Sequence, residues 1–105
     1  MIEALRQQDR DLICTRLNSE TAKIPWQELQ RFFAGGNTLL VAAELDLVEV
    51  ACSFHQDEVK LVKSWTDAGR VTDVTTGQAR DWVDRDNSLW AVVVKPWVLL
   101  QIIEQ

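Results

Sequence analysis

The sequence predicts an α+β domain in which a small, mainly antiparallel sheet of three to four strands is covered by four to five helices. Three observations support this fold class. The chain has 105 residues, which suits a single domain. Amphipathic helical segments alternate with short apolar runs typical of strands. The last two apolar runs, 88–94 and 97–103, are separated only by a Lys-Pro bend, as expected for neighbouring strands. We expect one domain over 1–105, with 1–11 frayed or variable.

A first helix is predicted close to the N-terminus. Residues 2–17 carry apolar side chains at a loose helical spacing, with charged residues between them. Asn18 and Ser19 follow, and both residue types favour helix caps over helix interiors. We therefore expect this helix to stop at Asn18-Ser19, and the same pair to supply the N-cap of a new helical segment.

Pro25 leaves two arrangements open for that next segment. Either a short turn spans 20–24 and the main helix starts at Pro25, or a single helix is kinked there. From Trp26 onward, apolar residues fall at i, i+3, i+6 and i+7, which places them on one helix face. The Gly35-Gly36 pair then ends the helix, because glycine adopts the left-handed C-cap conformation at little cost.

The middle of the chain predicts a buried strand followed by two helices. The apolar run 38–43 is short, which favours a strand buried on both faces. Asp46 is placed to cap the first helix and Asp57 to cap the second, which Gly69 ends. The apolar stripes of the two helices consist of Leu47, Val50, Ala51 and Phe54, and of Val59, Val62 and Trp65 with Leu61 beside them.

The last third of the chain predicts a weak strand, a short helix and the two final strands. The segment 70–74 alternates polar and apolar residues, and Thr75 with Gln78 matches a capping box. Ala79, Trp82 and Val83 share one face of the helix that this box opens. The run 88–94 is β-branched and aromatic, which strongly favours a strand. Its two faces carry Leu89, Ala91 and Val93, and Trp90, Val92 and Val94.

Charge and cysteine content argue against several classes of protein. The 16 acidic and 11 basic residues give a net charge of −5 and alternate along the chain, so no basic patch for nucleic acid is predicted. The apolar stretch 88–103 is too short to span a membrane. Cys14 and Cys52 form no paired motif, which suits free, mostly buried thiols in a reducing compartment. The N-terminus carries no signal-peptide pattern, so we expect a cytoplasmic protein that binds neither nucleic acid nor membranes.

No motif in the sequence predicts a catalytic residue, a cofactor or a metal. Cys52 and His55 stand three residues apart on a predicted helix, but a structural zinc needs four ligands. A buried thiol beside an exposed imidazole is the simpler interpretation. A Cys-His nucleophile would lack a visible orienting partner. The chain is therefore predicted to have no enzymatic activity, although the sequence leaves the question open.

An acidic cluster lies where the predicted strand 38–43 ends and a helix begins. It consists of Glu44, Asp46 and Glu49. Acids at helix N-termini are commonly capping residues, and we favour that interpretation. The alternative is a small-ligand or enzyme site that uses this cluster, with Lys95 as its counter-charge.

Tryptophan is the unusual feature of the composition, with five Trp and no Tyr. Trp26, Trp65 and Trp82 lie on predicted helix stripes, which indicates core positions. Trp90 and Trp97 instead flank the Lys-Pro bend, where a sheet with too few helices would leave an apolar face uncovered. An uncovered apolar face favours a non-enzymatic protein-interaction or regulatory module that self-associates through its apolar sheet. Its partner is another protein or a second copy of itself, as in a homodimer. The predicted contact residues are Trp90, Lys95, Pro96 and Trp97.

Three stretches together resemble a known family. They are LNSETAKIPWQELQRFFAGG (17–36), ELDLVEVA (44–51) and WAVVVKPWVLLQ (90–101). The chain is similar through them to a family of small bacterial proteins described as a domain of unknown function, and the resemblance covers most of 14–101. The resemblance implies a cytoplasmic bacterial protein that occurs as a stand-alone domain. It supplies no activity, cofactor or catalytic residue.

Overall fold

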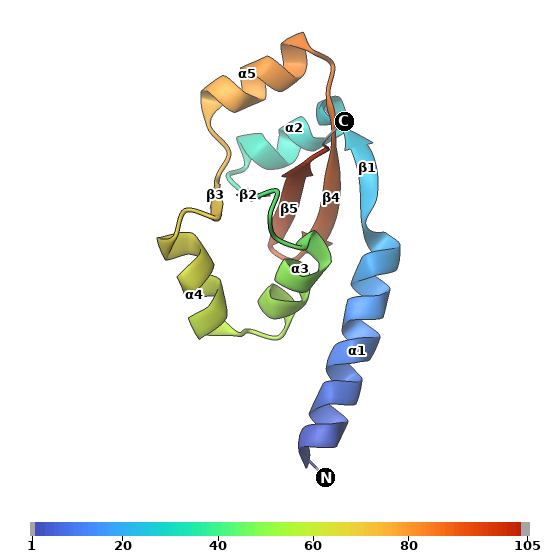
Figure 1. Cartoon of the computed structure of the whole chain (residues 1–105). Coiled ribbons are helices and arrows are strands. Elements are labelled where there is room, and N and C mark those ends of the chain that lie inside the picture. Colours follow the sequence, from blue (N-terminus) through green and yellow to red (C-terminus); the bar gives the residue numbers. More distant parts are fainter. Residues whose placement is uncertain (1, 104–105) are drawn as a thin grey trace.

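The structure is a computed structural model that describes the backbone of residues 2–103 and the side chains of residues 9–103. Within that range it contains five helices and one five-stranded sheet (Figure 1). The helices are α1 (Ile2–Glu20), α2 (Trp26–Ala34), α3 (Leu47–His55), α4 (Val59–Asp67) and α5 (Thr76–Asp84). The strands are β1 (Ala22–Pro25), β2 (Thr38–Val41), β3 (Val71–Asp73), β4 (Ser88–Val94) and β5 (Trp97–Ile102). The α+β class is confirmed, with five strands in place of the expected three to four.

The sheet is mixed, with the strand order β1-β4-β5-β2-β3. Its β1–β4, β4–β5 and β2–β3 pairings are antiparallel, whereas β2 runs parallel to β5. Strands β4 and β5 form a hairpin in which Val94 is the register partner of Trp97. The two residues between them, Lys95 and Pro96, are joined by a cis peptide bond. The predicted Lys-Pro bend between two neighbouring strands is therefore confirmed.

Helices lie over both faces of the sheet, and each face has its own apolar core. On one face α1 and α3 pack against Val92 and Leu99, and on the other α2 and α5 pack against Ala91 and Leu100. The predicted division of β4 holds, because Trp90, Val92 and Val94 belong to the first core and Leu89 and Ala91 to the second. Val93, at the hairpin end of the second face, is exposed. The expected uncovered sheet face is therefore absent from the described part of the chain.

Most of the predicted helix ends are confirmed. The Asp46 carboxylate accepts hydrogen bonds from the backbone N–H groups of Val48 and Glu49, at 2.9 and 3.3 Å. Thr75 and Gln78 form both hydrogen bonds of the capping box. Gly36 has a φ of +74°, which allows the chain to leave α2 in the left-handed conformation. Local side-chain chemistry therefore fixes these boundaries.

Two of the predicted boundaries are wrong. The first helix continues through Asn18-Ser19 to Glu20, and the Ser19 hydroxyl donates to the carbonyl of Arg16 rather than capping a new helix. The segment after it is strand β1 instead of a turn or helix, because its backbone pairs with β4. Pro25 then takes the N-cap position of α2. A tertiary hydrogen-bond partner thus outweighs the local preference.

Asp57 does not cap α4. The N-cap position belongs to Glu58, and the side chain of Glu58 makes no capping hydrogen bond. Asp57 instead occupies the turn between α3 and α4 with a φ of +58°, a conformation that Asp tolerates better than most residues. This turn bends α4 back beside α3, which positions the groove described below.

We expect Leu99→Ala to lower the free energy of unfolding by about 2–5 kcal/mol, because Leu99 is 0% exposed in the centre of the sheet. Denaturant unfolding followed by tryptophan fluorescence measures the change. Leu12→Ala is the matched control, since Leu12 is 67% exposed and its truncation is expected to cost less than about 0.5 kcal/mol. Equal losses at both positions would contradict the placement of Leu99.

Candidate functional site

An apolar groove lies between α4 and the hairpin end of β4 and β5. Its volume is about 510 Å³. Its apolar lining consists of Phe54, Val59, Val62, Val94, Pro96 and Trp97. Asp57, Lys63, Thr66 and Lys95 supply its polar atoms. Three of the four predicted contact residues, Lys95, Pro96 and Trp97, are therefore brought together at one concave surface.

The groove exists because α4 is amphipathic yet incompletely covered. None of the nine residues of α4 is buried, and Val59 is 65% exposed. Val62 and Trp65, on the same stripe, are only half-buried. An apolar stripe normally faces the protein core. Here Val59 and Val62 instead form one wall of a surface groove, whereas Trp65 packs against the first core as a partly buried side chain. The helical spacing of the stripe was predicted correctly, but the burial of Val59 and Val62 was not.

A second hollow continues the groove around the hairpin turn. Its volume is about 740 Å³, and it shares Phe54, Asp57, Val94 and Lys95 with the groove. Its other lining residues are Arg16, Glu20, His55 and Val93. Charged side chains of both signs, together with the single histidine, therefore stand beside the apolar groove. Sequence spacing gave no sign that residues of α1 would reach this place.

Trp90 lies apart from the other three predicted contact residues. Four positions along β4 separate it from Val94, which is about 13 Å at the usual strand rise. The Lys23 ammonium stands over its ring, 5.1 Å from the ring centroid. Trp90 also lines a shallow hollow of about 400 Å³ beside Glu44 and Asp46. It therefore belongs to the end of the molecule that carries the acidic cluster.

The three residues of the acidic cluster each have a separate role. Glu44 forms an ion pair with Arg70 at 3.6 Å, Asp46 caps α3, and Glu49 forms an ion pair with Arg10 at 3.3 Å. All three are exposed. The expected counter-charge, Lys95, instead lines the groove at the hairpin end. Glu44 and Asp46 line the hollow beside Trp90, whereas Glu49 and Lys95 do not, and capping accounts for Asp46.

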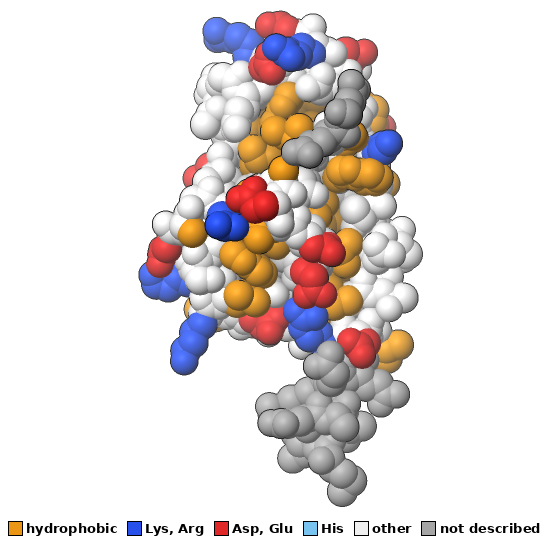
Figure 2. All heavy atoms as spheres, viewed as in Figure 1, with side chains coloured by type: hydrophobic (Ala, Val, Ile, Leu, Met, Phe, Trp, Pro, Cys, Tyr) orange, Lys and Arg blue, Asp and Glu red, His pale blue; other side chains and the backbone are white. Residues whose placement is uncertain are grey.

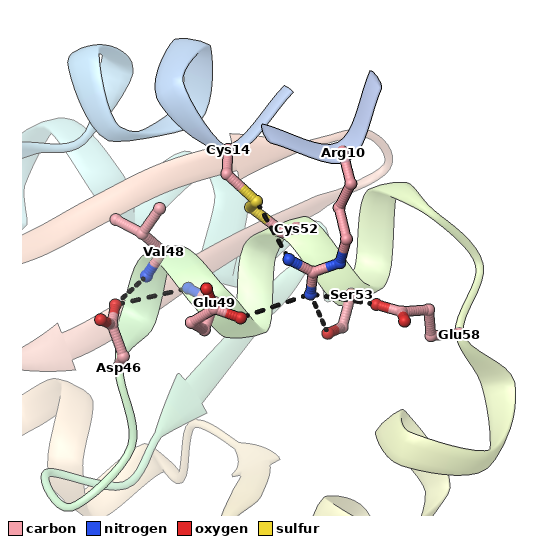
Figure 3. A network of polar contacts seen from close by, with 8 residues as sticks. All are labelled: Arg10, Cys14, Asp46, Val48, Glu49, Cys52, Ser53 and Glu58. Atoms are coloured by element: carbon pink, nitrogen blue, oxygen red, sulfur yellow. Dashed lines mark hydrogen bonds and ion pairs between the residues drawn. A yellow bond between two sulfur atoms is a disulfide. The ribbon is translucent and has the colours of Figure 1, made fainter. Parts of the chain in front are cut away.

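Arg10 is a site residue that the sequence analysis missed. It extends from α1 toward α3 and the start of α4, where its guanidinium meets two carboxylates (Figure 3). Its Nη2 lies 3.3 Å from Glu49 Oε2 and 3.2 Å from Glu58 Oε1. The same nitrogen donates to the buried Ser53 hydroxyl at 3.4 Å. The partners of Arg10 lie 39 to 48 residues away along the chain, so the spacing of neighbouring residues in the sequence could not reveal them.

Burial acts to lower the pKa of Arg10, but the hydrogen bond to Glu58 and the charges of Glu49 and Glu58 outweigh it. The pKa of Arg10 therefore lies above its ordinary value. Since arginine is already protonated throughout the physiological range, this side chain is a permanent positive charge at the α1–α3 contact.

The two cysteines adjoin this network and form a disulfide. Cys14 of α1 is bonded to Cys52 of α3, with 5.4 Å between their Cα atoms. Arg10 Nη1 donates to the Cys14 sulfur at 3.3 Å (Figure 3). The expectation of free thiols is therefore wrong. The 38 residues between the two positions conceal the contact, because it arises only when α1 packs along α3.

Two findings concern other classes of site. Among residues 9–103, whose side chains the structure describes, no group of three or more His, Cys, Asp or Glu side chains is placed to hold a metal ion. Among the described residues 2–103, no helix is both long enough and apolar enough to cross a membrane.

The charged side chains are dispersed over the face of the molecule that Figure 2 shows. Acidic and basic side chains are interspersed there among hydrophobic ones.

The fold and the groove define a small α+β domain with a mixed sheet covered on both faces. Residues 13–102 match the family described as "Protein of unknown function (DUF2288)", and the chain belongs to that family. The resemblance to a family of unknown function is thereby confirmed. The chain is also similar to a protein whose NMR solution structure has been solved, PA1075 from Pseudomonas aeruginosa. The two are 47% identical with a TM-score of 0.76, and the match covers 85% of this chain and 82% of that one. No curated protein matches the chain.

Asp46→Ala is expected to lower the free energy of unfolding by about 1 kcal/mol, because two backbone N–H groups at the start of α3 lose their acceptor. Denaturant unfolding measures the change. Asp46→Asn should retain most of the stability, since Asn is also a good N-cap. Glu44→Ala, which breaks only an exposed ion pair, should change the stability by less than about 0.5 kcal/mol. A loss with Asn as large as with Ala would argue against the capping role.

Proposed function

We propose that the protein is a non-enzymatic interaction module that self-associates through the groove between α4 and the β4–β5 hairpin. The observation that carries this proposal is the exposure of α4. An amphipathic helix with no buried residue leaves apolar area in water. A partner that covers Val59, Pro96 and Trp97 would remove that area from water, which is favourable in proportion to the area covered.

We infer a second copy of the chain as the occupant, because the same patch carries an exposed apolar side chain and a hollow. In a two-fold dimer each patch meets a copy of itself, so protruding and hollow parts must lie on the same patch. Val59 is 65% exposed on α4 and also lines the groove. Each copy would place its apolar α4 side chains against the groove of the other.

The charges around the groove support the same occupant. Asp57 and Lys95 both line the groove, and they carry opposite charges. Across a two-fold axis, Lys95 of one copy can face Asp57 of the other, which would favour a single docking orientation. A strongly basic or strongly acidic partner would gain less from such a mixed rim. Trp90 lies outside this contact surface, which therefore consists of the α4 stripe with Lys95, Pro96 and Trp97.

The proposal includes the cytoplasmic location expected from the sequence, without a nucleic-acid or membrane partner. The dispersed charge supports the absence of a nucleic-acid partner, because it provides no basic surface for phosphates on the face drawn in Figure 2. The cysteines no longer support the location, because Cys14 and Cys52 form a disulfide. Fractionation of cells that express the full chain tests the location. Recovery of the protein with membranes or outside the cytoplasm would contradict it.

Val59→Asp tests the self-association. Sedimentation equilibrium from low micromolar to near-millimolar concentration should show a reversible dimer for the wild type. The charged substitution should weaken the dimer at least about tenfold, because an aspartate would be desolvated against apolar side chains. Trp97→Ala should also weaken association, since it removes a large part of the groove wall.

Val83→Asp is the matched control. Val83 is 49% exposed on α5, which covers the opposite face of the sheet, so this variant should associate like the wild type. Circular dichroism shows whether each variant retains its fold. A wild type that remains monomeric throughout the concentration range would overturn the proposal, as would equal weakening by Val59→Asp and Val83→Asp. Binding of an apolar segment from another protein by a strictly monomeric chain would assign the groove to a different occupant.

A further inference from the structure

We propose that Cys14 and Cys52 are a reversible redox pair that reacts with hydroperoxides. Cys14 is the sulfur that meets the oxidant, and Cys52 is the resolving thiol that closes the disulfide. This inference goes beyond the proposed self-association and does not depend on it. It rests on the unequal burial of the two cysteine residues and on the position of Arg10.

The two cysteines differ in their access to solvent. Cys52 lies on α3 and is 0% exposed, whereas Cys14 on α1 is only partly buried. Of the two residues, only Cys14 is open to approach from solvent. The Cα atoms are 5.4 Å apart, within the range that a disulfide spans. This asymmetry distinguishes an attacking position from a resolving one.

Arg10 places a permanent positive charge against the accessible sulfur. Its Nη1 donates to Cys14 Sγ, while its Nη2 binds the carboxylates of Glu49 and Glu58 (Figure 3). In the dithiol form, the same guanidinium would favour the Cys14 thiolate, which is the reactive species. The contact is local, since Arg10 stands one helical turn before Cys14 on α1.

The neighbouring negative charges oppose this effect. Glu49 comes from α3, Glu58 from the turn before α4, and Asp11 stands one turn before Cys14 on α1. The two glutamates are 59% and 37% exposed, so water screens them more than it screens Arg10, whose side chain is 22% exposed. Arg10 is also the charged group in direct hydrogen-bond contact with the sulfur. The balance therefore favours the thiolate.

The proposed chemistry has two steps. The Cys14 thiolate attacks one oxygen of a hydroperoxide, the O–O bond breaks, and the departing alkoxide takes a proton to leave as an alcohol, or as water from hydrogen peroxide. Cys14 is then a sulfenic acid. The Cys52 sulfur attacks the Cys14 sulfur, the S–O bond breaks, and the hydroxide leaves as water with the Cys52 proton. Two thiols are oxidised by two electrons, and one hydroperoxide is reduced.

The first test measures whether the intact protein performs this reaction. The wild-type chain is reduced with dithiothreitol, freed of reductant, and treated with one equivalent of hydrogen peroxide. We expect the loss of both thiols and the formation of the Cys14–Cys52 disulfide, detected by mass spectrometry after alkylation. Reduced protein that keeps both thiols under these conditions would overturn the proposal and identify the disulfide as a static structural bond.

The second test separates the two sulfurs. In Cys52→Ser, or in Cys52→Ala if the serine variant is unstable, peroxide should generate a sulfenic acid at Cys14 that dimedone traps. In Cys14→Ser, the buried Cys52 should give no adduct in the folded protein. Equal trapping at both positions would contradict the assignment of Cys14 as the attacking sulfur.

The third test examines Arg10 through the pH profile of Cys14 alkylation by iodoacetamide in the Cys52 variant. The midpoint should lie below the ordinary thiol value of about 8.5. Arg10→Met should raise the midpoint, Arg10→Lys should largely restore it, and Glu58→Gln should lower it, because each substitution changes the charge near the sulfur. A merely structural Arg10 would leave the midpoint unchanged, and an unshifted midpoint in the Arg10→Met variant would remove Arg10 from the proposal.

Discussion

Strand β4 carries apolar side chains on both faces, and the rest of the fold depends on covering both. Val92 and Val94 point toward one core, and Leu89 and Ala91 toward the other. Each large aliphatic side chain that leaves water contributes about 1.5–3 kcal/mol, so neither face can remain open without a large loss of stability. A chain of 105 residues therefore divides its helices between the two faces. Helices α1 and α3 cover one face, and α2 and α5 cover the other.

With the other helices divided between the two faces, α4 is left with no fully buried residue. It follows α3 through a tight turn at Asp57 and packs beside α3 and the short strand β3. The sheet-facing space nearest to it is already occupied by α3 side chains and by Trp97 at the hairpin end. Val59 and Val62 of α4 consequently face a groove rather than an interior, while Trp65 packs against the first core. Whether an apolar helix side chain is buried or exposed thus depends on how many helices already cover that face of the sheet.

Features that depend on neighbouring residues were largely predictable from the sequence. The caps at Asp46 and Thr75, the glycine that ends α2, and the two faces of β4 all follow from spacings of a few residues. Strand β1 was not predictable, since Ala22 to Pro25 become a strand only through backbone pairing with β4. The sequence also placed Trp97 and Pro96 at a candidate contact surface. It could not supply the opposing wall of that surface, which comes from helix α4, about 30 residues earlier in the chain.

The contact between α1 and α3 brings together four residues that carry no recognisable motif in the sequence. Arg10, Cys14, Glu49 and Cys52 are unremarkable along the sequence, and their roles emerge when the two helices lie side by side. The spacing of Cys14 and Cys52 excluded known metal and redox motifs, but it could not exclude a pair formed across a helix–helix contact. For this reason free thiols were expected where a disulfide is present.

The two outer strands of the sheet limit how this domain can meet other chains. Strand β1 has four residues and ends in Pro25, and strand β3 at the opposite edge has three. Short edges and proline offer few consecutive backbone N–H and C=O groups to an incoming strand. Growth of the sheet by addition of strands from other molecules is therefore disfavoured at both ends. The strongly apolar strands β4 and β5 are kept inside the sheet, which protects a valine- and leucine-rich hairpin from edge-to-edge aggregation.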